Sequence, residues 1–165
     1  MILEHITAAH RGDLLAIAAA TGLFAPSDAE QLLGGVCDQL FARALPDGHM
    51  AWCCRPRAGE SPIGWSYFAP DQYADGVWNL WWLGVRPEFH GSGAGRQLLR
   101  AAESEAAARK ARVIVVETSA LEPLARARRF YAREGYAECG RVPDFYGEGD
   151  AKVIFARRPR ESAGA

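Results

Sequence analysis

The sequence predicts one α/β domain built on a mixed, mostly antiparallel central sheet, with a βαβ crossover and about four helices. Short apolar runs separated by turn residues predict the strands, and apolar side chains at helical spacing predict the helices. Of the 165 residues, 49% are hydrophobic and 24% charged, which is enough for one domain with a sizeable core. We expect that domain to cover residues 1–157, with a loose tail over 158–165.

The N-terminal part predicts a pair of helices joined by an apolar loop at 22–26. Residues 11–20 carry apolar side chains at helical spacing and are followed by a glycine. Ser27 and Glu30 have the spacing of a capping box, which predicts the start of the second helix. The buried stripe of that helix is expected to comprise Leu32, Leu33, Val36, Leu40 and Phe41. A further strand at 2–7 is compatible with the pattern.

Turn residues divide the rest of the chain into strands and two more helices. The expected strands are 49–55, 63–69, 77–85, 112–117, 136–142 and 152–157, and the expected helices are 95–110 and 123–134. The run from Val113 to Val116 is apolar throughout, as in a strand covered on both faces. Because a helix separates the strands at 77–85 and 112–117, the sheet is expected to cross over at its centre.

Composition argues against several classes of protein. No run approaches the ~18–20 apolar residues of a membrane-spanning helix, and the first residues lack the features of a signal peptide. We therefore expect a cytoplasmic protein without a membrane partner. The formal net charge of −1 argues against a general nucleic-acid binder. The four cysteines form no C-x-x-C pair, which argues against a zinc site and a disulfide framework.

The most specific motif follows the strand at 77–85. Residues 85–96 read Val-Arg-Pro-Glu-Phe-His-Gly-Ser-Gly-Ala-Gly-Arg and lead into a predicted helix. Glycines allow successive N–H groups to converge on one point, and the helix adds its positive end, so the segment suits a phosphate group. A Walker loop would need a lysine, and a Rossmann fingerprint would need a different glycine spacing. The alternative is a turn that only joins a strand to a helix.

Residues 90–95, His-Gly-Ser-Gly-Ala-Gly, resemble the pyrophosphate loop [QR]-x-x-G-x-[GA] of the GNAT superfamily of N-acetyltransferases at every position but the first. Residues 127–136, Ala-Arg-Arg-Phe-Tyr-Ala-Arg-Glu-Gly-Tyr, resemble its second signature, A-x-x-F-Y-x-x-x-G-F. The resemblance covers about residues 63–157. It implies the GNAT fold and transfer of an acetyl group from acetyl-CoA, as cosubstrate, to an amine. His90 replaces the usual Gln or Arg, and Leu121 to Leu124 stand where the family often has an Asn.

The resemblance also implies roles for particular residues. Tyr131 corresponds to the general acid that protonates the departing CoA thiolate. Glu117 ends an apolar strand, where ligands of open α/β sheets bind, and resembles the base of ribosomal-protein alanine acetyltransferases. The implied cofactor-binding residues are Leu83, Gly84, Val85, His90, Gly91, Ser92, Gly93, Ala94, Gly95 and Arg96. The structural alternatives are a packed Tyr131 and a Glu117 that pairs with a nearby arginine.

Aromatic and acidic side chains near the expected site are candidates for acceptor binding. Phe24 lies in the loop between the first two helices, and strand alternation places Trp81 on the face opposite Trp82. Asp144 and Tyr146 lie in the segment 142–150, which is expected to connect the last two strands and to border the acceptor. The alternatives are a core position for the aromatic residues and a solvated turn for the acidic ones.

The leading hypothesis is therefore an acetyl-CoA-dependent N-acetyltransferase that needs no metal. Its acceptor is a small-molecule amine or a peptide amine, and a homodimer is plausible for the family. The alternative is a catalytically silent acyl-CoA-binding sensor or interaction module, for which the departures at His90 and at 121–124 are the support. The identity of the acceptor and the acyl-chain preference stay open.

Overall fold

A computed structural model describes residues 1–23 and 26–159. The chain divides into two compact units. The first comprises Met1–Ala69 and Trp82–Ala102, and the second comprises Pro70–Trp81 and the chain from Glu103 onward. Phe24 and most of the expected C-terminal tail lie outside the described residues.

The sheet contains seven strands in the order β1-β2-β3-β4-β5-β7-β6. The strands are β1 (Ile2–His5), β2 (Met50–Arg55), β3 (Gly64–Pro70), β4 (Val77–Val85), β5 (Val113–Ser119), β6 (Ala137–Gly147) and β7 (Asp150–Arg157). The β4–β5 pair is parallel, whereas the β1–β2, β2–β3, β5–β7 and β6–β7 pairs are antiparallel. The predicted fold class and central crossover are thus confirmed.

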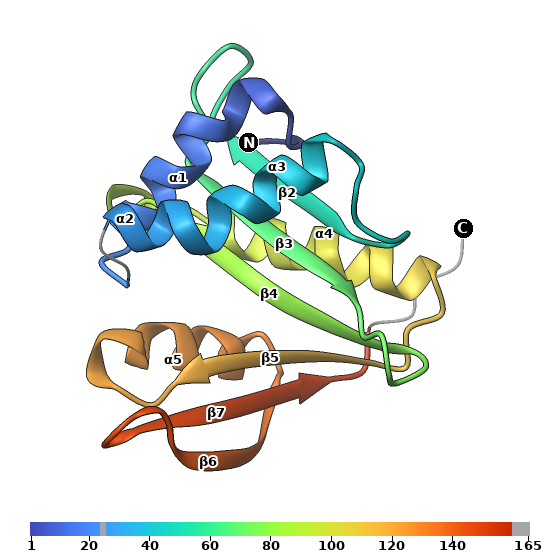
Figure 1. Ribbon diagram of the computed structural model, residues 1–165, viewed down its shortest axis with the longest axis vertical. Helices are drawn as coiled ribbons and strands as arrows, with labels where there is room; N and C mark the ends of the chain where they lie inside the picture. The colour runs from blue at the N-terminus through green and yellow to red at the C-terminus, as the bar shows by residue number, and fades with distance from the viewer. Residues whose placement is uncertain (24–25, 160–165) are drawn as a thin grey trace. The chain divides into compact units, whose positions relative to one another are not determined.

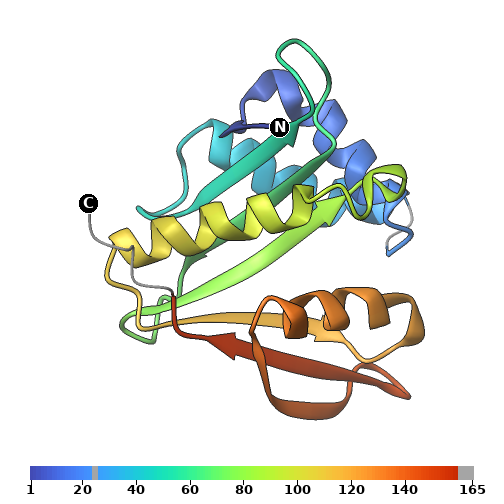
Figure 2. The ribbon, with the colours of Figure 1, turned by 180° about the vertical axis from the view of Figure 1, so that it is seen from behind.

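The helices are α1 (Arg11–Ala20), α2 (Pro26–Ala29), α3 (Gly35–Phe41), α4 (Ala94–Ala108) and α5 (Ala125–Arg133). In the first unit, α1 and α3 cover one face of β2 and β3 (Figure 1), and the N-terminal part of α4 covers the opposite face (Figure 2). No helix within residues 1–23 and 26–159 has the length and apolar character needed to cross a bilayer.

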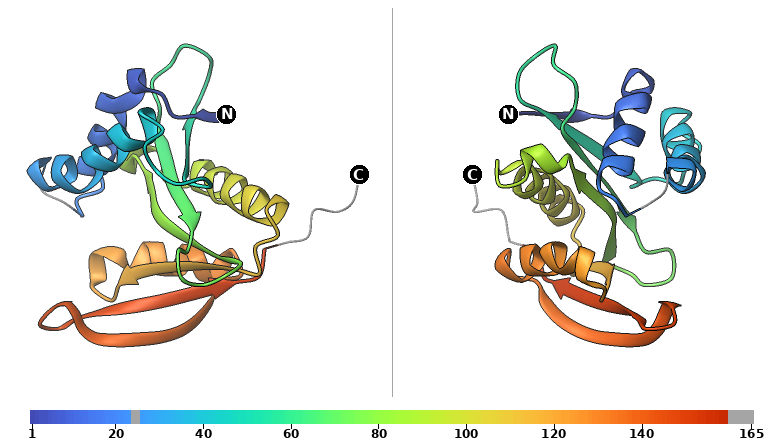
Figure 3. Two further views of the ribbon diagram at one scale, coloured as in Figure 1. Left: turned by 45° about the vertical axis from the view of Figure 1, so that its right-hand side comes forward. Right: turned by 90° about the vertical axis from the view of Figure 1, so that its left-hand side faces the viewer.

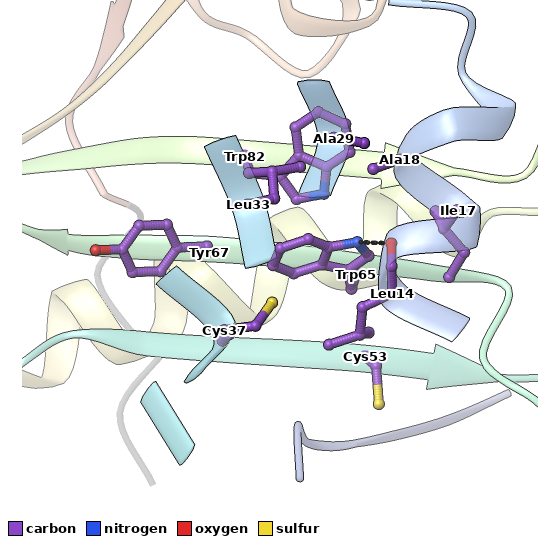
Figure 4. Close-up of a cluster of buried hydrophobic side chains, with 11 residues drawn as sticks. Leu14, Ile17, Ala18, Ala29, Leu33, Cys37, Cys53, Trp65, Tyr67 and Trp82 are labelled. Atoms are coloured by element: carbon purple, nitrogen blue, oxygen red, sulfur yellow. Dashed lines mark hydrogen bonds between the residues drawn. The ribbon is translucent and has the colours of Figure 1, made fainter. Parts of the chain in front are cut away.

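The first unit has a hydrophobic core on each face of its strands. Trp65 is fully buried under α1 and α3, and its indole N–H donates a hydrogen bond to the Leu14 carbonyl oxygen at 3.0 Å (Figure 4). Cys53 belongs to this cluster, whereas Cys54 faces the other cluster with Val85 and residues of α4. Strand alternation explains why the two neighbouring cysteines lie in different cores.

The predicted capping box at Ser27 is wrong. Ser27 lies inside α2, which begins at Pro26, and its hydroxyl donates to the Asp28 carboxylate at 3.2 Å. A π-helical turn, Glu30–Gly34, then joins α2 to α3. A π-helical turn holds more residues than an α-helical one and shifts the buried face. Leu32 of the predicted stripe is consequently 56% exposed.

In the second unit, α5 packs on one face of the hairpin formed by β6 and β7 (Figure 3). Arg157 of β7 pairs with the buried Glu103 carboxylate at 3.2 Å and donates to the Glu134 carbonyl oxygen at the end of α5. The predicted connection at 142–150 is too long. Strand β6 continues irregularly to Gly147, and only residues 148 and 149 separate it from β7.

Candidate active site

The glycine-rich loop lies between β4 and α4. Gly91 and Gly93 have φ angles of +88° and +92°, a region that residues with a side chain rarely adopt. The Gln97 N–H donates to the Gly93 carbonyl oxygen at 3.0 Å, so Gly93 immediately precedes the first helical turn. The N–H groups of a first helical turn have no partners within the helix, and they carry its positive dipole end. The loop therefore has the backbone geometry of an anion-binding turn.

His90 has a structural contact within this loop. Its Nε2 donates a hydrogen bond to the Val85 carbonyl oxygen at 3.0 Å, which connects the loop to the end of β4. Ser92 adds a second restraint, because its N–H donates to the Phe89 carbonyl oxygen at 3.2 Å. The residue that departs from the GNAT loop pattern thus stabilises the loop from within.

Close packing at the end of β4 explains a second glycine of the predicted site. A Cβ atom on Gly84 would lie 2.5 Å from the buried Trp82 ring. A Cβ atom on Gly64 of β3 would lie 2.9 Å from the Gly84 carbonyl oxygen. At position 64 a Cβ atom would obstruct this approach of the β3 and β4 backbones, whereas at position 84 it would meet the Trp82 ring, so each position favours glycine for its own reason.

Tyr131 is buried in the second unit. Its ring centroid lies 5.9 Å from that of Tyr136 and 6.0 Å from that of Phe155, and the side chain is 6% exposed. Burial raises the pKa of the Tyr131 hydroxyl well above its usual range. The hydroxyl therefore stays protonated at neutral pH and can serve only as a hydrogen-bond or proton donor to an anion.

Glu117 forms an ion pair with a lysine. The alternative to a catalytic role that the sequence suggested was a pair with an arginine. Its carboxylate lies 2.6 Å from the Lys152 Nζ, with the Glu117 side chain 38% and the Lys152 side chain 13% exposed. Lys152 Nζ also lies 3.5 Å from the centroid of the Phe145 ring. Sequence reasoning missed Lys152. No sequence signal could have found it, because the pairing follows from the register that places Lys152 opposite Ser119, on the same side of the sheet as Glu117.

Tyr131 and Glu117 lie on opposite faces of the sheet. In β5, Val116 and Thr118 are buried, while Glu117 between them is exposed. Phe155, which contacts Tyr131, is the register partner of Val116. A reaction that uses both groups must consequently take place beside the end of β5, since neither face of the strand offers both side chains.

The structure describes three of the four candidates for acceptor binding, Tyr146, Asp144 and Trp81. Tyr146 is 49% exposed, and partial burial together with the negative charges of Glu117 and Asp150 raises the pKa of its hydroxyl. Asp144, by contrast, accepts a hydrogen bond from the Gly149 N–H at 2.8 Å and so closes the β6–β7 turn. Trp81 is 57% exposed.

The chain belongs to the GNAT family of acetyltransferases. The family model described as an acetyltransferase (GNAT) domain matches residues 48–138, which is more than half of the chain. This range contains the glycine-rich loop, Glu117 and Tyr131. No curated protein sequence matches the chain.

Solved structures share the fold. A protein assigned to the GNAT family from Desulfovibrio desulfuricans is 24% identical over 96% of this chain and 99% of its own, with a TM-score of 0.81. An aminoglycoside 6'-N-acetyltransferase complexed with coenzyme A is 17% identical over 99% of this chain and all of its own, with a TM-score of 0.77. A ribosomal-protein-alanine N-acetyltransferase from Brucella melitensis is 20% identical over 96% and 99% of the two chains, with a TM-score of 0.70. Identities at this level establish the fold alone.

Proposed function

We propose that the protein is an N-acetyltransferase that moves the acetyl group of acetyl-CoA to a primary amine by direct attack in a ternary complex. The observation that carries the proposal is the loop before α4, with Gly91 and Gly93 at positive φ angles in a chain of the GNAT family. A structural neighbour binds coenzyme A, which supports the same cosubstrate here. The acceptor is a small molecule or a peptide amine.

The proposed cofactor site begins at the end of β4. The backbone groups of Leu83 to Val85 would pair with the pantetheine arm as an added strand would. Backbone N–H groups of the glycine-rich loop and of the first turn of α4 would hold the pyrophosphate, and Arg96 in that turn would add a positive charge. His90 acts on this site through the Val85 carbonyl oxygen.

Glu117 is the proposed base. An alkylamine has a pKa of about 10.4, so less than roughly one molecule in a thousand is neutral at pH 7. A nucleophilic nitrogen must therefore lose a proton as it attacks the thioester carbonyl carbon. The Glu117 carboxylate is already paired with the Lys152 ammonium group. A cationic acceptor would have to compete with Lys152 for that carboxylate.

Tyr131 is the proposed acid. The departing CoA thiolate would take the proton that the buried hydroxyl retains at neutral pH. Burial disfavours charged groups in general, so an apolar setting that raises the pKa of the hydroxyl also raises that of the thiol. Transfer of the proton from the Tyr131 oxygen to the CoA sulfur then costs less free energy than the raised pKa of Tyr131 alone implies.

The surroundings of Glu117 suit a cationic acceptor. Phe145, Tyr146 and Asp150 lie on the β6–β7 hairpin close to it, and an acidic group beside an aromatic face binds ammonium groups well. Structural neighbours acetylate an aminoglycoside and a ribosomal-protein alanine, which are amine acceptors of two different sizes.

The test is CoA thiol release from acetyl-CoA with pooled amines, peptides and aminoglycosides, with Tyr131→Phe and Glu117→Gln in parallel. Release that depends on one pool and falls in both variants supports the proposal. A catalytically silent acyl-CoA sensor is the second candidate, because Lys152 already engages the proposed base. Binding of acetyl-CoA without release from any pool would favour that candidate.

The proposal also includes the domain organisation, the cellular location and the oligomeric state. One acetyltransferase domain covers residues 1–157, the protein acts in the cytoplasm, and it forms a homodimer. The molar mass in solution, measured by light scattering at several concentrations, tests the homodimer. A constant monomeric mass would exclude it.

A further inference from the structure

The acceptor side of the site holds an amine that belongs to the protein itself. The chain uses arginine for almost all of its positive charge, and only two of its nineteen basic residues are lysines, Lys110 and Lys152. Lys110 is exposed just after the end of α4. Lys152 is instead shielded on β7, with its Nζ 2.6 Å from the Glu117 carboxylate.

Several contacts restrict the position of the Lys152 amine. The side chain is 13% exposed, and the Nζ lies between a carboxylate and the face of the Phe145 ring, 3.5 Å from its centroid. The backbone of Lys152 is held between two strands, because Lys152 is in register with Ser119 of β5 on one side and with Val142 of β6 on the other. An amine held in this way has lost most of the freedom that slows the reaction of a free one.

We propose that Lys152 is a self-acetylation site of this protein, an inference that rests on the proposed function. The Nζ of Lys152 takes the place of the acceptor nitrogen, and Glu117 is the group that receives its proton. This assignment uses the same carboxylate and the same acetyl donor as the transfer to a free amine. It adds only that the nearest amine is part of the chain.

The step balances without a further reactant. The Lys152 ammonium gives one proton to Glu117, and the neutral nitrogen forms a bond to the thioester carbonyl carbon. The bond from that carbon to sulfur then breaks, the nitrogen gives up its second proton, and the thiolate takes up a proton to leave as CoA. The products are acetyl-lysine, free CoA and one proton released to solvent.

The modification changes the site as well as the lysine. An acetylated Nζ has no positive charge and cannot form the ion pair with Glu117. Self-acetylation would therefore release the carboxylate for a cationic acceptor from solution.

The experiment is incubation of the purified chain with acetyl-CoA and no added amine, followed by peptide mass spectrometry. We expect an acetyl group on Lys152 and none on Lys110, which serves as the internal control for chemical acetylation. Glu117→Gln should slow the modification about a hundredfold, as removal of a general base typically does. Tyr131→Phe is the second variant, and thermal unfolding and acetyl-CoA binding of both variants establish that they are folded.

A mixing experiment tests whether the reaction occurs within one chain. Glu117→Gln, which retains Lys152, is mixed with Lys152→Arg, which retains Glu117. We expect the Glu117→Gln chain to be acetylated no faster in the mixture than when it is incubated alone. Faster acetylation of that chain in the mixture would overturn the reaction within one chain.

Other outcomes overturn the inference or the function separately. Equal acetylation of Lys110 and Lys152, or an unchanged rate in Glu117→Gln, would mean chemical acetylation. Thiol release with a pooled amine while Lys152 stays unmodified would overturn self-acetylation and leave the proposed function intact. If acetyl-CoA is bound but neither thiol release nor modification occurs, the proposed function fails and the inference fails with it.

Discussion

Gly84→Ala tests the packing at the end of β4. The new Cβ would lie 2.5, 3.0 and 3.3 Å from three atoms of the Trp82 indole ring, which is 7% exposed. A buried ring cannot move aside as the end of a flexible side chain can, so the backbone or the ring must shift. Overpacking of this kind costs about 2 kcal/mol. In a chain of this size that corresponds to a melting temperature lower by about 4–8 °C.

Gly147→Ala is the matched control, because a Cβ there meets no atom within 4 Å. Its free energy of unfolding should change by less than about 0.5 kcal/mol. Thermal unfolding followed by circular dichroism measures both variants. The cost of Gly84→Ala should shrink in a Trp82→Leu background, because the ring that it meets is gone. Equal melting temperatures for Gly84→Ala and Gly147→Ala, or an undiminished cost in that background, would refute this account.

Three further predictions concern the loop, the acid and pH. Gly93→Val should weaken CoA binding in a titration by at least about tenfold. Gly59→Val imposes similar backbone strain at φ +81° in the turn between β2 and β3, where a Cβ meets no atom within 4 Å, and should leave affinity unchanged. Tyr131→Phe should lower kcat by about a hundredfold with little change in KM, and a change confined to KM would instead mean that the hydroxyl positions substrate. Burial lowers the pKa of His49, so the unfolded chain binds the proton more readily, and stability should fall as the pH drops below about 6.5. Urea unfolding at pH 7.5 and 5.5 should show a smaller loss in His49→Gln than in the unchanged protein.

The pair of Glu117 and Lys152 bears on how the enzyme would select its acceptor. Because the Glu117 carboxylate is already paired with the Lys152 ammonium group, only an acceptor with a positive charge of its own can compete for it. A neutral nucleophile would not displace Lys152, so Glu117 would not be available to it as a base. The same pair therefore links the proposed specificity for amines to the proposed modification of Lys152.

Local patterns predicted the scaffold well because each element carries its own signal. The bounds of α1 and β4 agree with the sequence expectation residue for residue, since turn-forming or glycine residues flank both. The expectation failed at Ser27 and in β6. A π-helical turn leaves no mark in apolar spacing, and a strand with bulges and little buried surface resembles a loop.

The sequence by itself determined the glycine-rich loop, the apolar β5 and the Phe-Tyr helix, because glycine spacing and short-range periodicity depend on neighbouring residues alone. Only the tertiary structure decided what surrounds the candidate catalytic groups. The register of β5 against β7 brought Lys152 to Glu117, and the packing of α5 on Phe155 placed Tyr131 on the opposite face. Those relations join residues far apart in the chain, and no local pattern encodes the register that produces them.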